Sequence, residues 1–345
     1  MGDYKLCCFQ TGMFGDSREN LLAEVRKQLT RARDEGGKLV IYPQFWALNL
    51  VCPEEPADGI KLLKYLQKQG KTVRQTFLDT CGKLAGEFGL YLLPGSLLEV
   101  TDISSTETYD SIRFQNRAFL FSPQGQVILE QAQTHFSSWE EELLFGSVAP
   151  GNPYCTSGEC PDPPNLSLHQ GYTWPVKLCL EPGDSLQVVN TPLGVLGLVL
   201  GTDAWYPEVS RILSLQGAQV LLALTARPQP YNPWRQVAGM WQQVQQNQVY
   251  CAEACLVGNF LGKSFAGQSS LYGPCEITPG ETGVLSQAES ATEPEKVEAR
   301  ISLEMLGEIR SRYPLREHFN IPLYRRELGR VYSFEPEDKS ILCLE

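Results

Sequence analysis

Gln44 occupies a position where a side chain could take part in chemistry. The stretch KLVIYPQFWALNL, residues 38–50, begins with a short apolar run that Pro43 ends, because proline has no N–H to give to a strand ladder. Gln44 therefore follows the carboxyl end of a predicted strand, which is where open α/β sheets build ligand crevices. An uncharged amide there could bind a substrate, replace a catalytic acid or only shape a turn, and the local sequence leaves these roles open.

The other residue types that commonly carry chemistry form no recognisable pattern. The three histidines, His135, His169 and His318, are far apart in the sequence, so their spacing supports neither a zinc site nor a histidine-based triad. The glycine-rich stretch GVLGLVLGTD lacks the lysine of a phosphate-binding loop and does not open a helix directly. We therefore expect no metal and no cofactor.

The cysteines indicate a reduced compartment. The chain has 11 of them, an odd number scattered over 345 residues, which suits free and mostly buried thiols better than a disulfide framework. Cys155 and Cys160 are spaced too widely for a metal knuckle, and Cys251 and Cys255 are expected to face the core from a strand. The opening residues lack the pattern of a secretory signal, so we expect a cytoplasmic location.

The charge balance excludes two classes of partner. The formal net charge is -11, with 40 acidic and 29 basic residues, and no dense lysine or arginine block occurs. Nucleic acid and anionic membrane surfaces are therefore not expected partners. No apolar run approaches the roughly 20 residues that a membrane-spanning helix needs.

Helical and strand patterns alternate along the chain. Leu21, Leu22, Val25 and Leu29 have helical spacing after a capping residue at Asp16 or Ser17. We expect strands at 4–10, 38–43, 89–96, 218–224 and within 248–272, helices at 58–86, 206–216 and 233–247, and hairpins at 116–131 and 185–200. This mixture predicts mixed sheets covered by helices, stacked sheet against sheet.

Two stretches interrupt that pattern. Residues 146–184 contain seven prolines and five glycines and are expected to form an inserted surface loop. Residues 281–299 are acidic and poor in aromatic side chains, which is typical of a flexible connector.

Several segments together resemble the nitrilase or carbon–nitrogen hydrolase superfamily. The resemblance covers roughly residues 4–285 and rests on the order of the segments and on the residue pattern within each of them. The segments that carry it are YPQFW around residue 44, NRAFLFSPQGQVILEQAQTHF around 133, LGVLGLVLGTDAWYPEVSRILSLQGAQVLLALTA around 201, and also GLYLLPGS, EPGDSLQVVNTPLG, QQVQQNQVYCAEACLVGNFLG and FAGQSSLYGP. The segment around Asp203 is the most specific of them.

The resemblance places the family's catalytic residues at positions where this chain has replaced them. The family's catalytic Glu corresponds to Gln44, its Lys to Gln133, two residues before His135, and its nucleophilic Cys to Gly201, two residues before Asp203. The family's helix motif R-A-x-E-N reads QVQQN over residues 243–247, so that only its Asn is kept.

These replacements remove the family's chemistry. Its reaction needs a thiolate to attack an amide or nitrile carbon, a carboxylate to move the proton and an ammonium to stabilise the oxyanion. Glycine has no side chain to attack with, and a neutral glutamine neither accepts a proton near pH 7 nor brings a charge. Thr202 is adjacent, but neighbouring residues of a strand end point to opposite faces, and no base is evident beside it.

The resemblance implies a four-layer α-β-β-α sandwich. We expect a carbon–nitrogen hydrolase-like domain over 1–285 and a linker with a C-terminal tail over 286–345 that packs across a partner subunit. Helices 205–217 and 233–247 would pair two copies into a homodimer, with aromatic side chains at the interface. The same aromatics could instead be core.

Two functions of different class follow from this interpretation. One is a non-catalytic ligand-binding or scaffold protein that takes a small polar ligand in the family's pocket, and the other is a working C–N hydrolase with displaced catalytic groups. The second carboxylate of the family falls on Glu140, Glu141 or Glu142, and Glu141 is our candidate. The predicted neighbours of the replaced residues are Phe45, His135, Glu141, Thr202, Asp203 and Trp205.

Overall fold

The computed structural model of the chain describes residues 2–13, 18–52, 54–105, 110–145 and 176–333. The chain up to Leu306 forms one compact unit, and the chain from Gly307 onward forms a second. The first unit contains two large sheets, and each unit is described by itself.

The first sheet is built around three parallel strands. Its order is β16-β1-β2-β3-β5-β4, and β6 and β7 also pair with β5. β1, β2 and β3 run parallel, while β16 is antiparallel to β1 in a register that opposes Tyr4 to Ile301. The bounds are β1 Tyr4–Gln10, β2 Gly37–Tyr42, β3 Tyr91–Pro94, β4 Ser96–Ser105, β5 Asp110–Phe121, β6 Val127–Ala132, β7 Val176–Leu180 and β16 Glu295–Ile301.

The second sheet has a parallel centre of its own. Its order is β15-β14-β11-β10-β9-β8, in which β9, β10 and β11 are parallel. A separate hairpin joins β12 and β13. The bounds are β8 Val188–Thr191, β9 Gly194–Leu200, β10 Val220–Ala226, β11 Tyr250–Leu256, β12 Gly258–Phe260, β13 Lys263–Phe265, β14 Ser270–Tyr272 and β15 Val284–Gln287.

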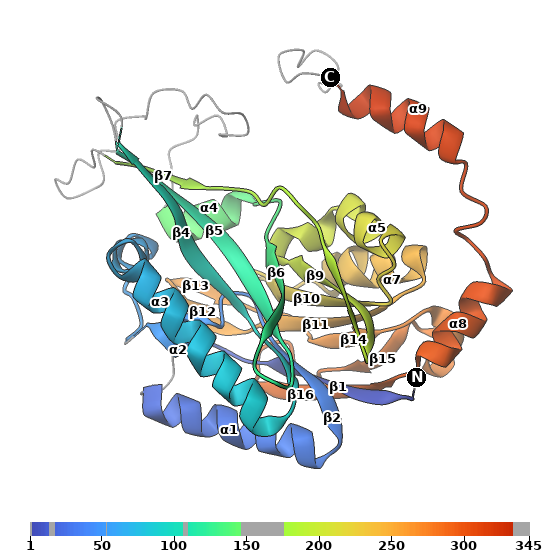
Figure 1. The fold of residues 1–345 in the computed structure, drawn as a ribbon, viewed down its shortest axis with the longest axis horizontal. Coiled ribbons are helices and arrows are strands. Elements are labelled where there is room, and N and C mark those ends of the chain that lie inside the picture. Colours follow the sequence, from blue (N-terminus) through green and yellow to red (C-terminus); the bar gives the residue numbers. More distant parts are fainter. Residues whose placement is uncertain (1, 14–17, 53, 106–109, 146–175, 334–345) are drawn as a thin grey trace. The chain divides into compact units, whose positions relative to one another are not determined.

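Helices cover both outer faces and connect the strands. Their bounds are α1 Arg18–Asp34, α2 Leu48–Val51, α3 Gly59–Phe88, α4 Ser138–Phe145, α5 Pro207–Leu215, α6 Pro233–Gln236, η2 Val237–Trp241, α7 Gln242–Asn247, α8 Leu303–Arg312 and α9 Ile321–Tyr332, with short turns η1 Gly201–Trp205, η3 Cys275–Ile277 and η4 Pro279–Glu281. Figure 1 shows α1 and α3 on one side of the sheets and α5 and α7 on the other.

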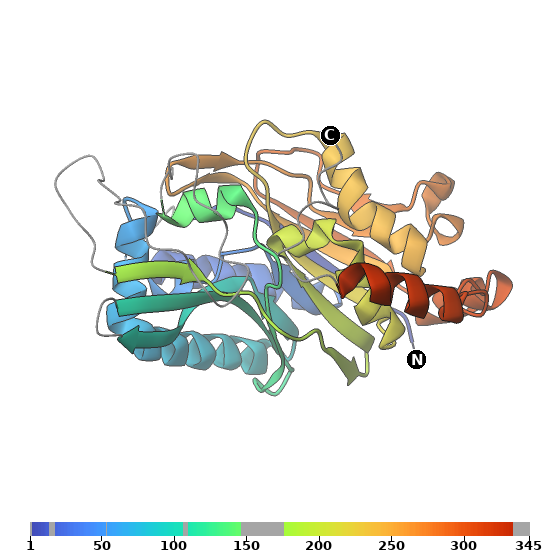
Figure 2. The same ribbon diagram turned by 90° about the horizontal axis from the view of Figure 1, so that it is seen from above.

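The alternation of side chains along the strands creates four layers. In β1, Leu6 and Cys8 belong to the apolar cluster between the two sheets, whereas Cys7 and Phe9 belong to the cluster under α1 and α3. A third cluster packs α5 and α7 on the outer face of the second sheet. Figure 2 shows α3 and α7 on opposite sides of the stacked sheets. The architecture is the predicted α-β-β-α sandwich.

Local signals fix where the covering helices begin and end. The Asp58 carboxylate accepts a 2.7 Å hydrogen bond from the Lys61 N–H at the start of α3, and Gly89 ends that helix in the left-handed conformation with φ of 64°. The predicted helix at 233–247 is not continuous. It bends through a π-helical turn at η2, where Gly239 has non-helical backbone angles, and this break separates α6 from α7.

The tail differs from its prediction. The prediction of a flexible connector at 281–299 was wrong. This stretch contains β15 and β16, and β16 pairs with β1 along its full length. Its acidic side chains are balanced there, since Lys5 and Lys296 both bond Glu298 at 2.7 Å. The boundary between the two units falls after Leu306 and not at residue 285.

Part of the predicted surface loop is also a strand. Residues 176–180 of the 146–184 insertion form β7, which runs parallel to β5. Residues 146–175 lie outside the described part of the chain, as do Cys155, Cys160, His169 and the expected caps Asp16 and Ser17.

The second unit contains α9, which Asn320 caps by accepting a 3.1 Å hydrogen bond from the Leu323 N–H. Apolar side chains of this helix are exposed, Leu328 and Val331 among them. The predicted packing of this tail on a partner subunit stays a prediction.

Candidate functional site

Gln44, Gln133 and Gly201, the predicted counterparts of the family's catalytic residues, meet at one place in the structure. Gln44 follows β2, Gln133 follows β6 and Gly201 follows β9, and the Gln44 Nε2 donates to the Gln133 Oε1 at 3.2 Å. Both glutamine side chains are completely buried. Asn116 orients Gln133 further by donating to the same Oε1 at 2.8 Å. A buried amide pair therefore stands where the resemblance places the family's catalytic Glu and Lys.

Glu140 is the charged centre of this cluster. One carboxylate oxygen accepts hydrogen bonds from the Gln44 and Gln133 amides, each at 2.8 Å. The other accepts from the Ser137 N–H at 2.8 Å, the Ser137 hydroxyl at 2.9 Å and the Thr202 hydroxyl at 2.7 Å. Five donors thus surround one buried carboxylate, and neutral groups satisfy it where a lysine would otherwise do so.

Glu141, our candidate for the second carboxylate, lies beside this centre and does not enter it. Burial raises the pKa of the half-buried Glu141, and the neighbouring Glu140 carboxylate raises it further. Glu142 points elsewhere and pairs with Lys263 at 2.7 Å. A sequence signal could have selected Glu140, because it shares a helix face with the buried Leu143 and Leu144 at spacings of three and four residues.

Gly201 leaves no room for a side chain. Its φ of +52° is in the left-handed region that side chains disfavour. A Cβ placed on it would lie 2.4 Å from the Gln44 Nε2, 2.7 Å from the Glu140 Oε1 and 2.9 Å from the Gln133 Nε2. The two amides and the carboxylate therefore occupy the space that a nucleophilic side chain at residue 201 would need.

Asp203 and His135 join two loops of the site. The buried Asp203 carboxylate accepts from the Thr134 hydroxyl and the His135 N–H at 2.8 Å each, and lies 3.0 Å from the His135 Nδ1. The His135 ring stacks on Tyr206, with 3.7 Å between ring centroids. These contacts hold the loop after β6 against the loop after β9, so both residues position the site and do not face a ligand.

Phe45 also has a positioning role. Its φ is +64°, its N–H donates to the Ser96 hydroxyl at 2.9 Å, and its buried ring packs against Phe260 with 5.9 Å between centroids. Phe45 does not line the cavity that opens beside Gly201 and Thr202.

A cavity of about 350 Å³ opens beside Gly201 and Thr202. We call it the 201 cavity. Its size is within the range of small-molecule sites, about 300–1,000 Å³. Trp205, which we predicted near the replaced residues, forms part of its wall. The complete lining is Ser137, Trp139, Gly201, Thr202, Trp205, Thr225, Ala226, Arg227, Pro228, Pro230, Tyr231, Asn232 and Arg235.

The sequence analysis missed Arg227, which follows β10. Its guanidinium forms an ion pair with Glu253, a fully buried residue of β11. It also donates to the Thr225 hydroxyl at 3.0 Å and to the Cys255 Sγ at 3.3 Å. No signal in the sequence singles out this pair, because its members are separated by 26 residues.

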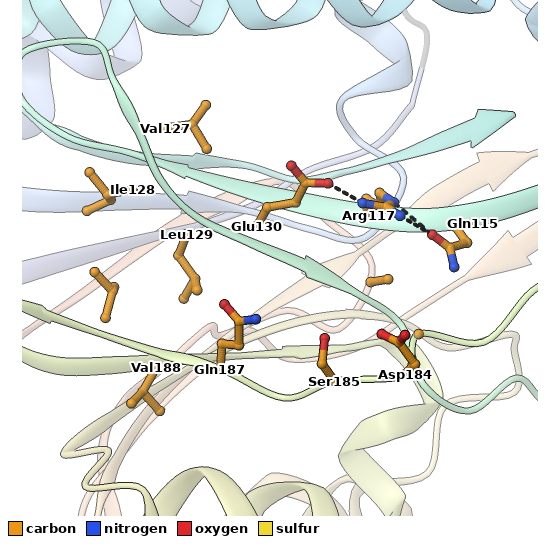
Figure 3. A pocket seen from close by; sticks show the side chains of 13 residues that line it. Gln115, Arg117, Val127, Ile128, Leu129, Glu130, Asp184, Ser185, Gln187 and Val188 are labelled. Carbon is orange, nitrogen blue, oxygen red and sulfur yellow. Dashed lines mark hydrogen bonds and ion pairs between the residues drawn. The ribbon is translucent and has the colours of Figure 1, made fainter. Parts of the chain in front are cut away.

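A larger hollow, of about 500 Å³, lies between β6 and the segment 183–189 (Figure 3). Three of its polar side chains are paired with one another, because Arg117 donates to the Gln115 Oε1 at 2.9 Å and forms an ion pair with Glu130. None of the three replaced residues lines it. We therefore place the functional site at the 201 cavity despite its smaller volume.

Within the described residues, no group of three or more His, Cys, Asp or Glu side chains could hold a metal ion. The described cysteines are free thiols, and most of them are buried. None of the described helices combines the length and the apolar character needed to cross a bilayer.

Solved structures with the same fold are known. A carbon-nitrogen hydrolase from Helicobacter pylori matches with a TM-score of 0.65 at 20% identity, covering 94% of this chain and 97% of that one. A double mutant of the amidase from Nesterenkonia sp. AN1, in complex with acrylamide, matches with a TM-score of 0.61 at 16% identity over 94% of this chain and 97% of its own. These likenesses support the four-layer fold.

Sequence relatives and a family model identify the family. The omega-amidase NIT2 of Xenopus tropicalis is 24% identical over 307 residues, which cover 87% of this chain and 90% of the relative. The carbon-nitrogen hydrolase family model matches residues 8–310. This match covers more than half of the chain and shows that the chain belongs to the carbon-nitrogen hydrolase family.

Proposed function

We propose that this protein is a member of the family that binds a small polar ligand in the 201 cavity without hydrolysing it. The observation that carries the proposal is the buried cluster of Gln44, Gln133 and Glu140, whose atoms lie within 3 Å of where a Cβ of residue 201 would be. Five hydrogen bonds satisfy the Glu140 carboxylate at the centre of the cluster, whereas the buried Gln44 Oε1 has no partner among the described residues.

The chemistry of the cluster agrees with this proposal. The covalent route needs an attacking atom and a positive group beside the developing oxyanion. Residue 201 offers no attacking atom, and Gln133 offers a neutral N–H. In a protease of another family, loss of the nucleophile alone costs on the order of a millionfold in turnover. Binding does not depend on these groups, and the cavity beside them is open.

The Nesterenkonia amidase gives a parallel for binding without the intact catalytic set. Its double mutant, with glutamine in place of a glutamate and alanine in place of a cysteine, is in complex with acrylamide. That protein has the same fold as this one, and its replaced residue types are similar to those found here.

A second candidate function is hydrolysis with a displaced nucleophile, and one observation favours it. Thr202 lines the 201 cavity, and its hydroxyl donates to the Glu140 carboxylate at 2.7 Å. The expectation that Thr202 has no carboxylate beside it was wrong, because residues 201–205 form a 3₁₀ turn and not a strand end. Against this role, both oxygens of Glu140 already accept several hydrogen bonds, and no cationic side chain contacts the cluster within the described residues.

An activity assay separates the two candidates. The purified protein is incubated with a panel of amides, nitriles and N-acyl compounds, and ammonia release is compared with that from the Thr202→Val variant. We expect both proteins to release ammonia at the rate of buffer alone. Release by the native protein that the Thr202→Val change abolishes would replace the binding proposal with the displaced-nucleophile mechanism.

We further propose that the protein forms a homodimer through the surface of α5 and α6. Several large apolar side chains of this surface are exposed, and Trp234 is 78% exposed. Exposed aromatic and aliphatic side chains on neighbouring elements are typical of protein interfaces. The exposed members are Trp205, Tyr206, Ile212, Leu215, Trp234 and Val237.

A further inference from the structure

We infer that the ligand of the 201 cavity is an organic carboxylate with a flat apolar body. This inference rests on the proposed function, since it names the class of ligand for the same site. It starts from the charge of the lining. Two of the thirteen residues that line the cavity are arginines and none is acidic, although the whole chain has 40 acidic and 29 basic residues.

Arg227 offers a fixed donor at the inner wall. Its Nε is buried and has no hydrogen-bond partner among the described residues, while the rest of the guanidinium is held by Glu253, Thr225 and Cys255. A buried N–H without a partner is unfavourable, so an acceptor supplied by a ligand that reached it would stabilise it. Because Glu253 balances its charge, Arg227 recognises an oxygen atom without adding a net charge.

Arg235 supplies the positive charge of the cavity. It lies in α6, whose first turn is fixed by the Asn232 side chain accepting from the Trp234 N–H at 2.9 Å and the Arg235 N–H at 3.4 Å. The Arg235 side chain is exposed and has neither an ion pair nor a hydrogen bond to any described residue. One uncompensated charge favours a ligand with one negative charge, which a carboxylate provides.

The remaining walls describe the rest of the ligand. Trp139 and Trp205 present indole rings, and Pro228 and Pro230 present flat apolar surfaces. Such walls favour a planar apolar body, because binding removes its apolar surface from water. The lining has four hydroxyl groups, and each already donates to another side chain: those of Ser137 and Thr202 to Glu140, that of Thr225 to Glu253 and that of Tyr231 to Gln236. Together these groups fit an aryl-alkyl carboxylate better than a sugar or a polyphosphate.

A matched pair of compounds tests this inference. Binding of 3-phenylpropionate and of 3-phenylpropanamide, which differ in charge and little in shape, is measured on the full chain by isothermal titration calorimetry and ligand-observed NMR. We expect the acid to bind at least tenfold more tightly than the amide, and its affinity to fall when the salt concentration rises from 0.05 to 0.5 M.

Variants assign the preference to the cavity. Arg235→Gln, an exposed change that leaves the fold intact, is expected to weaken binding of the acid at least fivefold and of the amide less than twofold. Arg300→Gln removes another exposed arginine, which lies in β16 outside the cavity and pairs with Asp3, and should change neither affinity. Replacing Arg227 alone would leave Glu253 buried without its partner, so the double change Arg227→Gln with Glu253→Gln is used, and it should also weaken the acid selectively.

Several results would overturn the inference, and they differ from a failure of the proposed function. Equal affinity for the acid and the amide, an unchanged affinity in Arg235→Gln or an absence of binding by both compounds would each refute the carboxylate assignment. Release of ammonia from the amide would instead refute the proposed lack of hydrolysis, and the preference for the acid would then be measured as competitive inhibition.

Discussion

Replacing Gly201 by alanine measures how completely the buried cluster fills the place of a nucleophile. The change adds one methyl group and no chemistry. The backbone of residue 201 is left-handed, with φ of +52°, and this conformation disfavours a Cβ by about 1–2 kcal/mol. The methyl carbon would also lie 2.4 Å from the Gln44 Nε2, which must move away from the Glu140 carboxylate that it bonds at 2.8 Å.

The expected magnitude combines these two effects. A hydrogen bond to a charged group contributes about 1.5–3 kcal/mol. Adding the backbone effect gives an expected loss of about 2.5–5 kcal/mol in the free energy of unfolding. The assay is equilibrium denaturation in urea, followed by tryptophan fluorescence at several protein concentrations.

A matched control isolates the backbone effect. Gly89 ends α3 with a similar φ of +64°, and nothing lies within 4 Å of a Cβ placed on it. Gly89→Ala should therefore lose only about 1–2 kcal/mol. The double variant Gln44→Ala with Gly201→Ala should recover part of the loss, because the shorter side chain removes the closest contact. If Gly201→Ala and Gly89→Ala lowered the free energy of unfolding by the same amount, there would be room for a side chain at residue 201. The proposed lack of catalysis would then lose its main support.

Three other predictions follow from contacts in the first unit. Burial raises the pKa of the Cys255 thiol to about 11, so about one molecule in a thousand carries a thiolate at pH 8, and iodoacetamide should label the half-buried Cys275 before Cys255. Hydrogen bonds from Lys296, and to a smaller extent from Arg31, lower the pKa of Glu35 from 4.5 to about 2. The contact therefore stabilises the fold above about pH 5, and this stabilisation is lost as the pH falls towards 2. In urea denaturation, the stability difference between the native protein and Lys296→Met should be larger at pH 7 than at pH 3. Ile212→Asp should convert the proposed dimer to a monomer in light scattering coupled to size-exclusion chromatography.

Each of these predictions has a contradicting result. Labelling of Cys255 before Cys275 would reveal a reactive thiol beside the 201 cavity. A stability difference for Lys296→Met that did not depend on pH would mean that the ion pair with Glu35 contributes nothing. A native protein that is already monomeric would contradict the dimer proposal. The surface variant Lys38→Asp is the control for Ile212→Asp, since it also places an aspartate on the surface.

The sequence by itself determined the local features of this protein. Period-two alternation, as in Leu6 and Cys8 against Cys7 and Phe9, and helix signals such as Asp58 and Gly89 act over a few residues, so the order of strands and helices could be predicted. The family's order of segments then located the replaced positions at the ends of three strands, although it could not show whether they form a working pocket.

Tertiary structure decided what surrounds those positions. Glu140, and not Glu141, reaches the amides because the rotation of a short helix selects one of three adjacent glutamates. The chain from 281 to 299 is polar enough to be read as a connector, but its pairing with β1 depends on partners almost 300 residues away.

Tertiary structure also decided which side chains line the 201 cavity. Arg227 and Glu253 come from two neighbouring strands, and Arg235 comes from the helix that follows the first of them. Their types carry no pattern in the sequence, because an ion pair or a cavity is defined by distance in space and not by spacing along the chain. The sequence thus predicted where the counterparts of the family's catalytic residues lie, and only the packing of the elements decided which side chains surround them.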